Sequence, residues 1–459
     1  MSSYKDFFKN KKITVMGLGI LGRGLGYTKF LAECGADLIV TDLKTKEQLQ
    51  TSMKELEKYI IPAKGRAGIK FVLGEHRLED FKNRDMIIKS AGVPLNSIYI
   101  KEAEKKNIPI EMDVSLFAKH APGVTLVGVT GTRGKSMTTA LIYEILKQNE
   151  KFLKHKVYIG GNVRGVATLP LLKKVKKGDI LVCELDSWQL QGFGDAKLSP
   201  HISVFTSFMP DHMNYYKNSM KNYFNDKANI FKYQTKDDIL IIRPDMKKLI
   251  PKNIKSKLIV VNAKDADKYA STLPGKFQKE NLACAVEVAK QFKIGESKIK
   301  QAVKNFKGLE GRLQYLKTVK GVKIYNDNNA TTPEATMAGI EALSLNLKSP
   351  KIVLICGGSD KKLLLDNFVK VINKYCKAVF LIPGTGTDAL LRKKLKVENY
   401  EAKDLIDAVK EAMIYAEKSL PAGRQGDTIL FSPAFASFGM FNNEYERNDL
   451  FMKIIKKLK

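Results

Sequence analysis

The chain has 459 residues and a formal net charge of +30, and 44% of its residues are hydrophobic against 27% charged. This composition excludes a disordered chain, and the length leaves room for about three domains. No apolar run is long enough to cross a bilayer, and the charged N-terminus lacks the pattern of a signal peptide. The five cysteines stand singly with no CxxC pair, so we expect buried, reduced thiols in a cytoplasmic protein.

The positive charge comes from 78 lysine and arginine residues against 48 aspartate and glutamate residues. A strongly basic chain is typical of nucleic-acid-binding proteins. Here the basic residues are spread along the chain and form no basic tail, which disfavours a nucleic-acid partner. We expect the charge either to attract polyanionic small substrates or to be a lysine-rich surface without a function of its own.

Short apolar segments alternate with helical patterns along the whole chain. Strand-like segments occupy residues 13–19, 37–42, 86–92, 124–131, 179–185, 202–208, 351–358, 378–384 and 428–434, and helical patterns cover residues 136–148 and 281–292. The alternation predicts an α/β fold with mainly parallel sheets. Glycine-rich junctions near residues 17–26, 128–136 and 356–362 each suit the start of a domain, so we predict domains at 1–120, 121–309 and 310–459. Residues 419–428 are rich in glycine and proline and predict an exposed loop.

The first glycine-rich loop runs from Gly17 to Gly22, after an apolar strand and before a helical pattern. Its GxGxxG spacing lets the backbone approach a pyrophosphate at a helix N-terminus. Asp42 closes the next predicted strand, 20 residues after Gly22, where it would meet a ribose or a base. The loop therefore indicates a nucleotide site such as that of an NAD-dependent oxidoreductase, unless it is a tight turn without a ligand.

The second glycine-rich loop, GTRGKS at residues 131–136, has the chemistry of a phosphate-binding loop. Its amides would wrap phosphates, Lys135 would balance their charge, and the Ser136 hydroxyl would ligate Mg²⁺. Glu184 and His212 follow later strands, and a carboxylate at a neighbouring strand end is placed to hold Mg²⁺. The loop predicts binding of ATP or GTP, which does not fit a simple dehydrogenase.

Nine motifs, in order along the chain, resemble those of the Mur ligases of peptidoglycan synthesis. They are GTRGKSMTT (131–139), GGNVRG (160–165), ELDSWQL (184–190), DHMNYY with YFNDKANIF (211–231), GKFQKENLACA (275–285), FKGLEGRLQYL (306–316), YNDNNATTPEAT (325–336), CGGSDKK (356–362) and FSPAFASFGMFNNEYERNDLF (431–451). The resemblance covers essentially the whole chain. The last motif looks most like that of the members that add D-glutamate to UDP-N-acetylmuramoyl-L-alanine.

The resemblance implies a Rossmann-like N-terminal domain, a central P-loop ATPase-like domain and a C-terminal Rossmann-like α/β domain that closes over the site. It implies an ATP-dependent amide ligase that works through an acyl phosphate, which the glutamate amine attacks. The implied substrates are UDP-N-acetylmuramoyl-L-alanine, glutamate and ATP, with two Mg²⁺ ions to spread the transferring charge. The expected protein is a cytoplasmic monomer with no membrane or nucleic-acid partner.

The resemblance also assigns roles to residues of this sequence. For catalysis it implies Lys135, His212 and Lys227, the last as a carbamate that turns a cation into a metal-binding anion. For ATP it implies Gly131, Thr132, Arg133, Gly134, Lys135, Ser136, Asn281, Arg312 and Asp327, and for metal Ser136, Glu184, His212 and Lys227. For the sugar nucleotide it implies Gly19, Ile20, Leu21, Gly22, Asp42 and Asn162. For the amino acid it implies Thr331, Lys361, Ser437 and Phe438.

Several positions depart from the family motifs. They are Arg133 in place of asparagine, Asp186 in place of serine, Gly311 in place of histidine, Gln278 in place of asparagine, Asn328-Asn329 in place of Ser-Lys, and Glu444 in place of an aromatic residue. The lysine expected at position 329, near the glutamate carboxylate, is therefore missing. Two interpretations stay open: Lys361 alone holds D-glutamate, or the acceptor is L-glutamate or another amino acid.

Other classes of protein fit fewer of these features. A folylpolyglutamate-synthase-like ligase shares the phosphate loop but has no need of the Gly17 to Gly22 loop. An NAD-dependent oxidoreductase is disfavoured by the phosphate loop and by the lack of a second catalytic constellation. A nucleic-acid-binding ATPase would need clustered arginines and aromatics, whereas lysine dominates here and Trp188 is the only tryptophan.

Overall fold

The computed structural model describes residues 4–20, 22–61, 68–94, 96–269, 273–345, 352–418 and 427–458. Two compact units make up the chain: Met1–Ala266 with Glu280–Ala302, and Asp267–Lys279 with Val303–Lys459. Two predictions, Leu21 as a site residue and the loop over residues 419–426, lie outside the described residues. No helix in the described part of the chain combines the length and the apolar character needed to cross a membrane.

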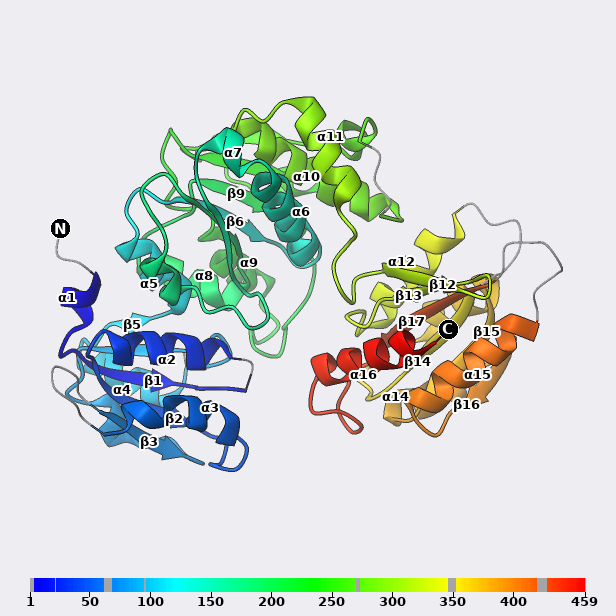
Figure 1. Ribbon diagram of the computed structural model, residues 1–459, viewed down its shortest axis with the longest axis horizontal. Helices are drawn as coiled ribbons and strands as arrows, with labels where there is room; N and C mark the ends of the chain where they lie inside the picture. Colours follow the sequence, from blue (N-terminus) through cyan, green and yellow to red (C-terminus); the bar gives the residue numbers. More distant parts are fainter. Residues whose placement is uncertain are drawn as a thin grey trace. The chain divides into compact units, whose positions relative to one another are not determined.

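The first unit holds two parallel sheets with helices packed on them (Figure 1). The first sheet has the order β3-β2-β1-β4-β5, with β1 Lys12–Met16, β2 Asp37–Asp42, β3 Ile69–Leu73, β4 Met86–Lys89 and β5 Ile110–Glu111. Its helices are α1 Tyr4–Phe8, α2 Arg23–Glu33, α3 Gln50–Leu56, α4 Ile98–Lys105 and α5 Asp113–His120. All of its strand pairs are parallel, as βαβ connections require.

The second sheet has the order β11-β10-β9-β6-β8-β7 and is also parallel throughout. Its strands are β6 Thr125–Thr130, β7 Val157–Gly161, β8 Ile180–Glu184, β9 Ile202–Phe205, β10 Ile239–Ile242 and β11 Lys257–Val260. The helices that follow them are α6 Lys135–Gln148, α7 Glu150–Leu153, α8 Ser187–Asp195, α9 Met220–Ala228, α10 Lys276–Gln291 and α11 Glu296–Asn305. One hydrophobic core, with buried side chains from Phe8 to Ile250, runs through both sheets of this unit.

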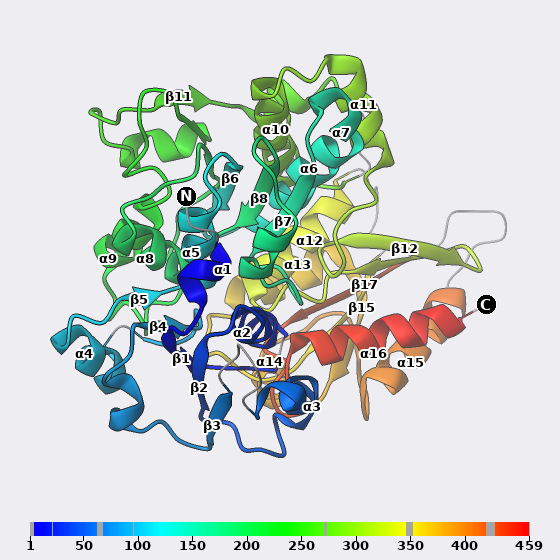
Figure 2. The same cartoon turned by 60° about the vertical axis from the view of Figure 1, so that its left-hand side comes forward.

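The second unit holds the third sheet, in the order β12-β13-β17-β14-β15-β16. Its strands are β12 Gln314–Val319, β13 Val322–Asn326, β14 Ile352–Gly357, β15 Cys376–Ile382, β16 Glu398–Glu401 and β17 Thr428–Ala434, and only the β12–β13 pair is antiparallel. The helices are α12 Pro333–Ser344, α13 Asp366–Tyr375, α14 Thr385–Leu391, α15 Leu405–Lys418 and α16 Glu444–Lys457. Helices α15 and α16 lie side by side in both views (Figure 1 and Figure 2).

The alternation along β14 explains why this sheet is covered on both faces. Ile352, Leu354 and Cys356 belong to one buried cluster, whereas Val353 and Ile355 belong to the other. A strand whose two faces are both buried has a continuous run of apolar residues in its sequence, and β14 has such a run.

The predicted α/β fold with mainly parallel sheets is therefore confirmed, and each glycine-rich junction lies between a strand and the segment that leads to the next helix. All five cysteines are buried and none forms a disulfide. The domain boundaries near residues 120 and 310 stay predictions.

Candidate functional site

The phosphate-loop candidate connects β6 to α6 in the first unit. Gly134 is the N-cap of α6 with a φ of 86°, and Gly131 has a φ of 146°. A Cβ at Gly131 would collide with the Thr206 hydroxyl, and a Cβ at Gly134 would collide with the amide of Asn281. Asn281 accepts a hydrogen bond from Thr138 of α6 at 3.3 Å. Asn281 of α10 thus lies against the loop with which the sequence analysis grouped it.

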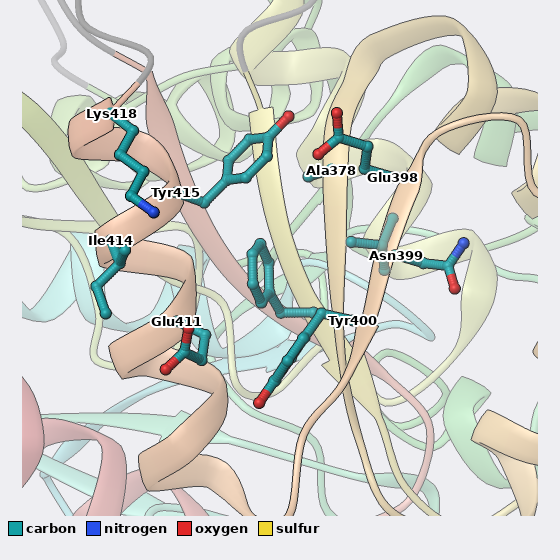
Figure 3. Close-up of a pocket in the computed structure, with 10 residues that line it drawn as sticks. Ala378, Glu398, Asn399, Tyr400, Glu411, Ile414, Tyr415 and Lys418 are labelled. Carbon is teal, nitrogen blue, oxygen red and sulfur yellow. The ribbon is translucent and has the colours of Figure 1, made fainter.

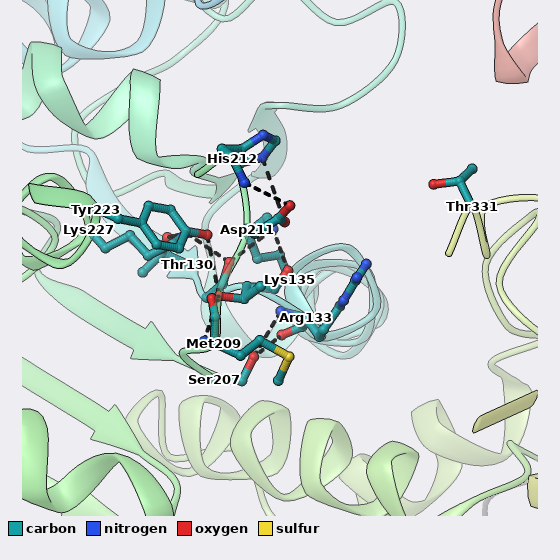
Figure 4. A network of polar contacts seen from close by, with 12 residues as sticks. Thr130, Arg133, Lys135, Ser207, Met209, Asp211, His212, Tyr223, Lys227 and Thr331 are labelled. Carbon is teal, nitrogen blue, oxygen red and sulfur yellow. Dashed lines mark hydrogen bonds and ion pairs between the residues drawn. The ribbon is translucent and has the colours of Figure 1, made fainter. Parts of the chain in front are cut away.

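The segment after β9 holds this loop in place. The Thr132 N–H donates to the Ser207 carbonyl at 2.8 Å, and the Arg133 N–H donates to the Ser207 hydroxyl at 2.8 Å. The Met209 N–H donates to the Thr132 hydroxyl at 3.1 Å. Figure 4 shows that the Arg133 side chain extends to the side of the loop opposite Lys227. The sequence analysis missed Ser207 and Met209 as supports, because the contacts join segments more than 70 residues apart.

Two lysine side chains converge on one carbonyl of the loop (Figure 4). The Lys135 Nζ donates to the Gly131 carbonyl at 3.0 Å, and the Lys227 Nζ donates to the same oxygen at 2.9 Å. Lys227 is only 1% exposed, and its Nζ lies 4.9 Å from the centre of the Tyr223 ring. Burial, together with the neighbouring Lys135 ammonium, lowers the pKa of Lys227 well below its usual value. The neutral amine is therefore favoured at this position.

The residue before Lys227 fixes the helix that carries it. The Asp226 carboxylate accepts hydrogen bonds from the Gln191 amide at 2.8 Å and from the Tyr216 hydroxyl at 3.0 Å. Because Gln191 belongs to α8 and Asp226 to α9, these bonds tie the two helices together. Neither Gln191 nor Tyr216 was among the predicted site residues.

Acidic groups and a histidine surround the two lysines. Glu184 ends β8 and is 6% exposed, and it acts with Asp186 and Asp211 to oppose the lowering of the Lys227 pKa. Asp186 also caps α8, since its carboxylate accepts the Gln189 N–H at 2.7 Å in a capping box. An aspartate at this position of the motif therefore has a structural role as the cap of α8.

His212 adopts a left-handed backbone conformation, with a φ of 54°, beyond the end of β9. Burial lowers the pKa of its imidazole. The Trp188 ring packs against this imidazole at a centroid distance of 4.7 Å and against the Tyr215 ring at 5.6 Å. An aromatic wall thus positions the histidine beside the loop.

The predicted metal ligands, Ser136, Glu184, His212 and Lys227, include a hydroxyl and an amine. No group of three histidine, cysteine, aspartate or glutamate side chains gathers as a metal site among the residues that the structure describes. A lysine amine is a poor ligand for a hard cation, whereas a carboxylate or carbamate oxygen suits Mg²⁺. Glu184 supplies a carboxylate oxygen of the kind that Mg²⁺ prefers, whereas Lys227 would suit Mg²⁺ only as a carbamate.

The first glycine-rich loop is organised by Asp42. This carboxylate is 5% exposed and accepts the Gly19 N–H at 2.8 Å and the Lys44 N–H at 2.9 Å. Both oxygens thus serve the backbone of the loop and of the β2 end. Ile20, in the same loop, is 47% exposed.

Asn162 links this loop to the second sheet. Its side-chain oxygen accepts a hydrogen bond from Arg23 at 2.9 Å, and its N–H donates to the Glu184 carbonyl at 2.7 Å. A Cβ at Gly22 would lie 3.9 Å from the Cα of Gly165. The structure therefore brings Asn162, which lies next to the backbone of Glu184, beside the end of the first glycine-rich loop.

In the second unit, the four predicted amino-acid-binding residues follow three neighbouring parallel strands. Thr331 follows β13, Lys361 follows β14, and Ser437 and Phe438 follow β17, which pairs with both of those strands. The Lys361 Nζ donates to the Thr331 hydroxyl at 3.1 Å. Ser359 pairs with Ala436 as an isolated bridge, and its hydroxyl donates to the Phe438 carbonyl. All four residues therefore lie at one edge of the third sheet.

Asp327 and Arg312, predicted for ATP, belong to the same unit. The Asp327 carboxylate accepts the Leu313 N–H at 2.9 Å and the Ser432 hydroxyl at 2.9 Å. Burial raises the pKa of Asp327 to about 7, and Arg312 opposes this shift.

Four of the departures from the family motifs in this unit, Gly311, Asn328, Asn329 and Glu444, lie together. The Asn328 amide donates to the Glu444 carbonyl at 2.9 Å and its side-chain oxygen accepts from the buried Arg447 at 2.9 Å. The Asn329 N–H donates to the Gly311 carbonyl at 3.0 Å, and a Cβ at Gly311 would lie 3.2 Å from the Asn329 side chain. Glycine at position 311 therefore makes room for Asn329, so these substitutions form one packed group.

A hollow of about 260 Å³ between β16 and α15 lies apart from these residues (Figure 3). Glu398, Glu411, Tyr415 and Lys418 are among the residues around it, and none of its lining residues is a predicted site residue. Its charged groups carry both signs, which indicates no ligand class.

Three family models match the chain: Mur ligase MurD-like N-terminal domain at residues 11–111, Mur ligase middle domain at 129–299, and Mur ligase glutamate ligase domain at 311–435. The chain is 34% identical to the UDP-N-acetylmuramoylalanine--D-glutamate ligase of Borreliella burgdorferi over 99% of both chains. It is 33% identical to the enzyme of that name from Roseiflexus sp., covering 97% of this chain and 98% of the relative. The crystal structure of a UDP-N-acetylmuramate-alanine ligase from Thermotoga maritima has the same fold, with a TM-score of 0.61 at 18% identity, covering 98% of this chain and 100% of that one. The chain belongs to the Mur ligase family.

Proposed function

We propose that this Mur ligase joins D-glutamate to the alanyl carboxylate of UDP-N-acetylmuramoyl-L-alanine, converting ATP to ADP and phosphate. The convergence of Lys135 and Lys227 on the Gly131 carbonyl supports the proposal best, because both side chains lie at the N-terminus of α6, where a phosphate would bind. The names of full-length relatives above 30% identity support the same substrates.

The glycine loop would bind the phosphates of ATP through its own amides and the N-terminus of α6. Gly131 and Gly134 let the loop pack closely against Thr206 and Asn281, which would leave its amides free to face a phosphate and Asn281 near the nucleotide. The Lys135 ammonium donates to the Gly131 and Thr132 carbonyls at 3.0 and 3.2 Å. With ATP, we expect it to leave them for the β- and γ-phosphates.

Mg²⁺, when bound, would neutralise charge on the transferring phosphoryl group. Ser136, Glu184 and His212 would hold it with Lys227. An unprotonated amine is needed to attack carbon dioxide, and burial favours that form of Lys227. The amine nitrogen would bond to the carbon of carbon dioxide and release one proton, leaving a carbamate.

The acceptor amino acid would bind at the edge of the third sheet. Lys361 and Thr331, which are already hydrogen-bonded to each other, would meet its carboxylate, with Ser437 and Phe438 beside them. The residue at position 329 supports a second candidate, a Mur-type ligase for L-glutamate or another amino acid. Asn329 provides an amide where the family motif has a lysine, so one cation is absent.

An assay of ADP release with UDP-N-acetylmuramoyl-L-alanine and a panel of amino acids tests the proposal. We expect turnover with D-glutamate above that with every other amino acid, and none without the sugar nucleotide. Preference for L-glutamate or another amino acid would select the second candidate. ADP release that does not depend on the sugar nucleotide would contradict both.

A further inference from the structure

A second cavity, of about 540 Å³, lies in the first unit away from every predicted site residue. Its walls come from Tyr4 of α1, from Lys119 and His120 at the end of α5, and from Lys176 and Lys177 before β8. Three lysines, a histidine and a tyrosine therefore face one cavity, and none of the described residues that line it is an aspartate or a glutamate.

The wall that carries Lys176 and Lys177 is a fixed turn. Asp179 accepts the Lys176 N–H at 2.8 Å, and the Gly178 N–H donates to the Gly123 carbonyl at 2.7 Å. The stem of Lys177 lies over Gly123, where a Cβ would come within 2.9 Å of the Lys177 Cγ. Gly123 also has a φ of 87°, so a larger residue there would meet both steric and backbone strain. The backbone thus places these two ammonium groups at the cavity.

The part of the wall formed by Lys119 and His120 carries less unneutralised positive charge than the turn with Lys176 and Lys177. The His120 ring packs against Phe7 and Phe8 at centroid distances of 4.2 and 5.3 Å. The Lys119 ammonium donates to Glu111 at 2.6 Å, which offsets its charge. Lys176 and Lys177, in contrast, form no ion pair with any residue that the structure describes. The unneutralised charge at the cavity therefore belongs to Lys176 and Lys177.

We propose that this cavity binds a small anionic molecule that joins a phosphate to an apolar group. The ammonium groups of Lys176 and Lys177 would meet the phosphate, with Tyr4 and His120 as further hydrogen-bond partners. Leu172 and Val175, which also line the cavity, would contact the apolar part. The walls come from α1, from the end of α5 with the turn before β6, and from the segment before β8, so the ligand would join helices of the first sheet to the second sheet.

Calorimetric titration of the full chain with phenyl phosphate tests this site. The K176Q/K177Q double variant removes both charges and keeps the backbone bonds of the turn. We expect its affinity for phenyl phosphate to fall at least about tenfold, as the loss of charge-assisted hydrogen bonds predicts. The matched control is K105Q/K106Q, which removes two exposed lysines of the same unit and changes the net charge equally. We expect the control to bind as the parent protein does.

Binding at the Gly131 to Gly134 loop would contribute equally in all three proteins, so the difference between the variants isolates the cavity. Equal weakening in both double variants would show that only the overall field of a +30 chain attracts the anion, and would overturn the proposal. So would unchanged binding in K176Q/K177Q, or no binding to the parent protein.

V175D, which puts a carboxylate into the lining of the cavity, offers an independent second variant and should abolish binding. Thermal unfolding of each variant checks that it is folded.

Discussion

The two glycine-rich loops of the first unit share a backbone geometry and differ in the charges around it. Each follows a parallel strand and opens a helix, and the N-cap glycines have φ and ψ of 82° and −15° at Gly22 and 86° and −12° at Gly134. In the first loop, the Asp42 carboxylate accepts a backbone N–H. In the second loop, the side-chain nitrogens of Lys135 and Lys227 both donate to the Gly131 carbonyl.

The comparison separates what the backbone supplies from what side chains supply. The turn and the helix N-terminus attract phosphate in both loops. A carboxylate beside the first loop would favour the hydroxyls of a ribose, whereas the Lys135 ammonium beside the second would suit negative charge that grows during transfer. The first loop therefore suits recognition of one nucleotide, and the second loop suits chemistry on the phosphates of another.

Lys135→Ala should have the largest effect, because it removes the cation from the second loop alone. We expect ADP release to fall by roughly 10²–10³-fold, as the loss of one preorganised electrostatic contact predicts. Calorimetry should show unchanged binding of UDP-N-acetylmuramoyl-L-alanine. Lys147→Ala, in the last turn of the same helix, is the control and should keep its activity. Near-normal ADP release by Lys135→Ala would contradict the assignment of this loop to ATP.

Lys227→Ala should be nearly inactive, since it removes the carbamate that we propose as a metal ligand. Short carboxylic acids such as acetate should partly restore ADP release by filling the vacated anion position. The parent protein should also lose activity when carbon dioxide is removed from the buffer. Lys221→Ala, an exposed position on the same helix, should show neither effect. A fully active Lys227→Ala protein would remove this lysine from the metal site.

Asp42→Asn tests the first loop and should have a smaller effect. The amide keeps one acceptor oxygen, so either Gly19 or Lys44 loses its partner. We expect calorimetry to show sugar-nucleotide binding weakened by about 1–3 kcal/mol, with the KM for ATP unchanged. The parent protein should not bind NAD⁺. Tight NAD⁺ binding would instead favour the oxidoreductase interpretation of this loop.

Asn329→Lys extends the comparison to the loops of the third sheet and should have the smallest effect. A second cation there should strengthen D-glutamate binding by at most ~1–3 kcal/mol, which would lower the KM for D-glutamate. The gain is reduced because the new side chain must leave the space beside Gly311 that Asn329 occupies.

Lys361→Ala should raise the KM for the acceptor far more than that for ATP. An unchanged acceptor KM in Lys361→Ala would place the amino acid elsewhere.

The sequence predicted the elements whose signal is local. Apolar runs identified the strands, and the spacing around Gly19, Gly22 and Gly134 identified two strand-to-helix loops. Such signals lie within about ten residues, because a strand and its following turn are set by neighbours in the chain.

The supports of the site could not be predicted, because they join distant segments. Ser207 meets Arg133 across 74 residues, and Asp226 meets Gln191 across 35. The group formed by Asn328, Asn329, Gly311 and Glu444 was visible only as separate departures from the motifs, and packing shows that these residues contact one another. The sequence predicted that Asp42 ends a strand. It did not predict that the Asp42 carboxylate accepts the N–H of Gly19, 23 residues away.

The contact between Trp188 and His212 gives the protein an intrinsic optical reporter. Trp188 is the only indole in 459 residues, so the tryptophan fluorescence of the whole chain originates beside the imidazole, at a centroid distance of 4.7 Å. Emission from an indole responds to charges and paramagnetic ions close to its ring. Titration with Mn²⁺ in place of Mg²⁺ should therefore quench this emission as the cation reaches His212, which gives an affinity without any turnover. Trp188→Phe keeps an aromatic ring at this position and provides the control without tryptophan emission.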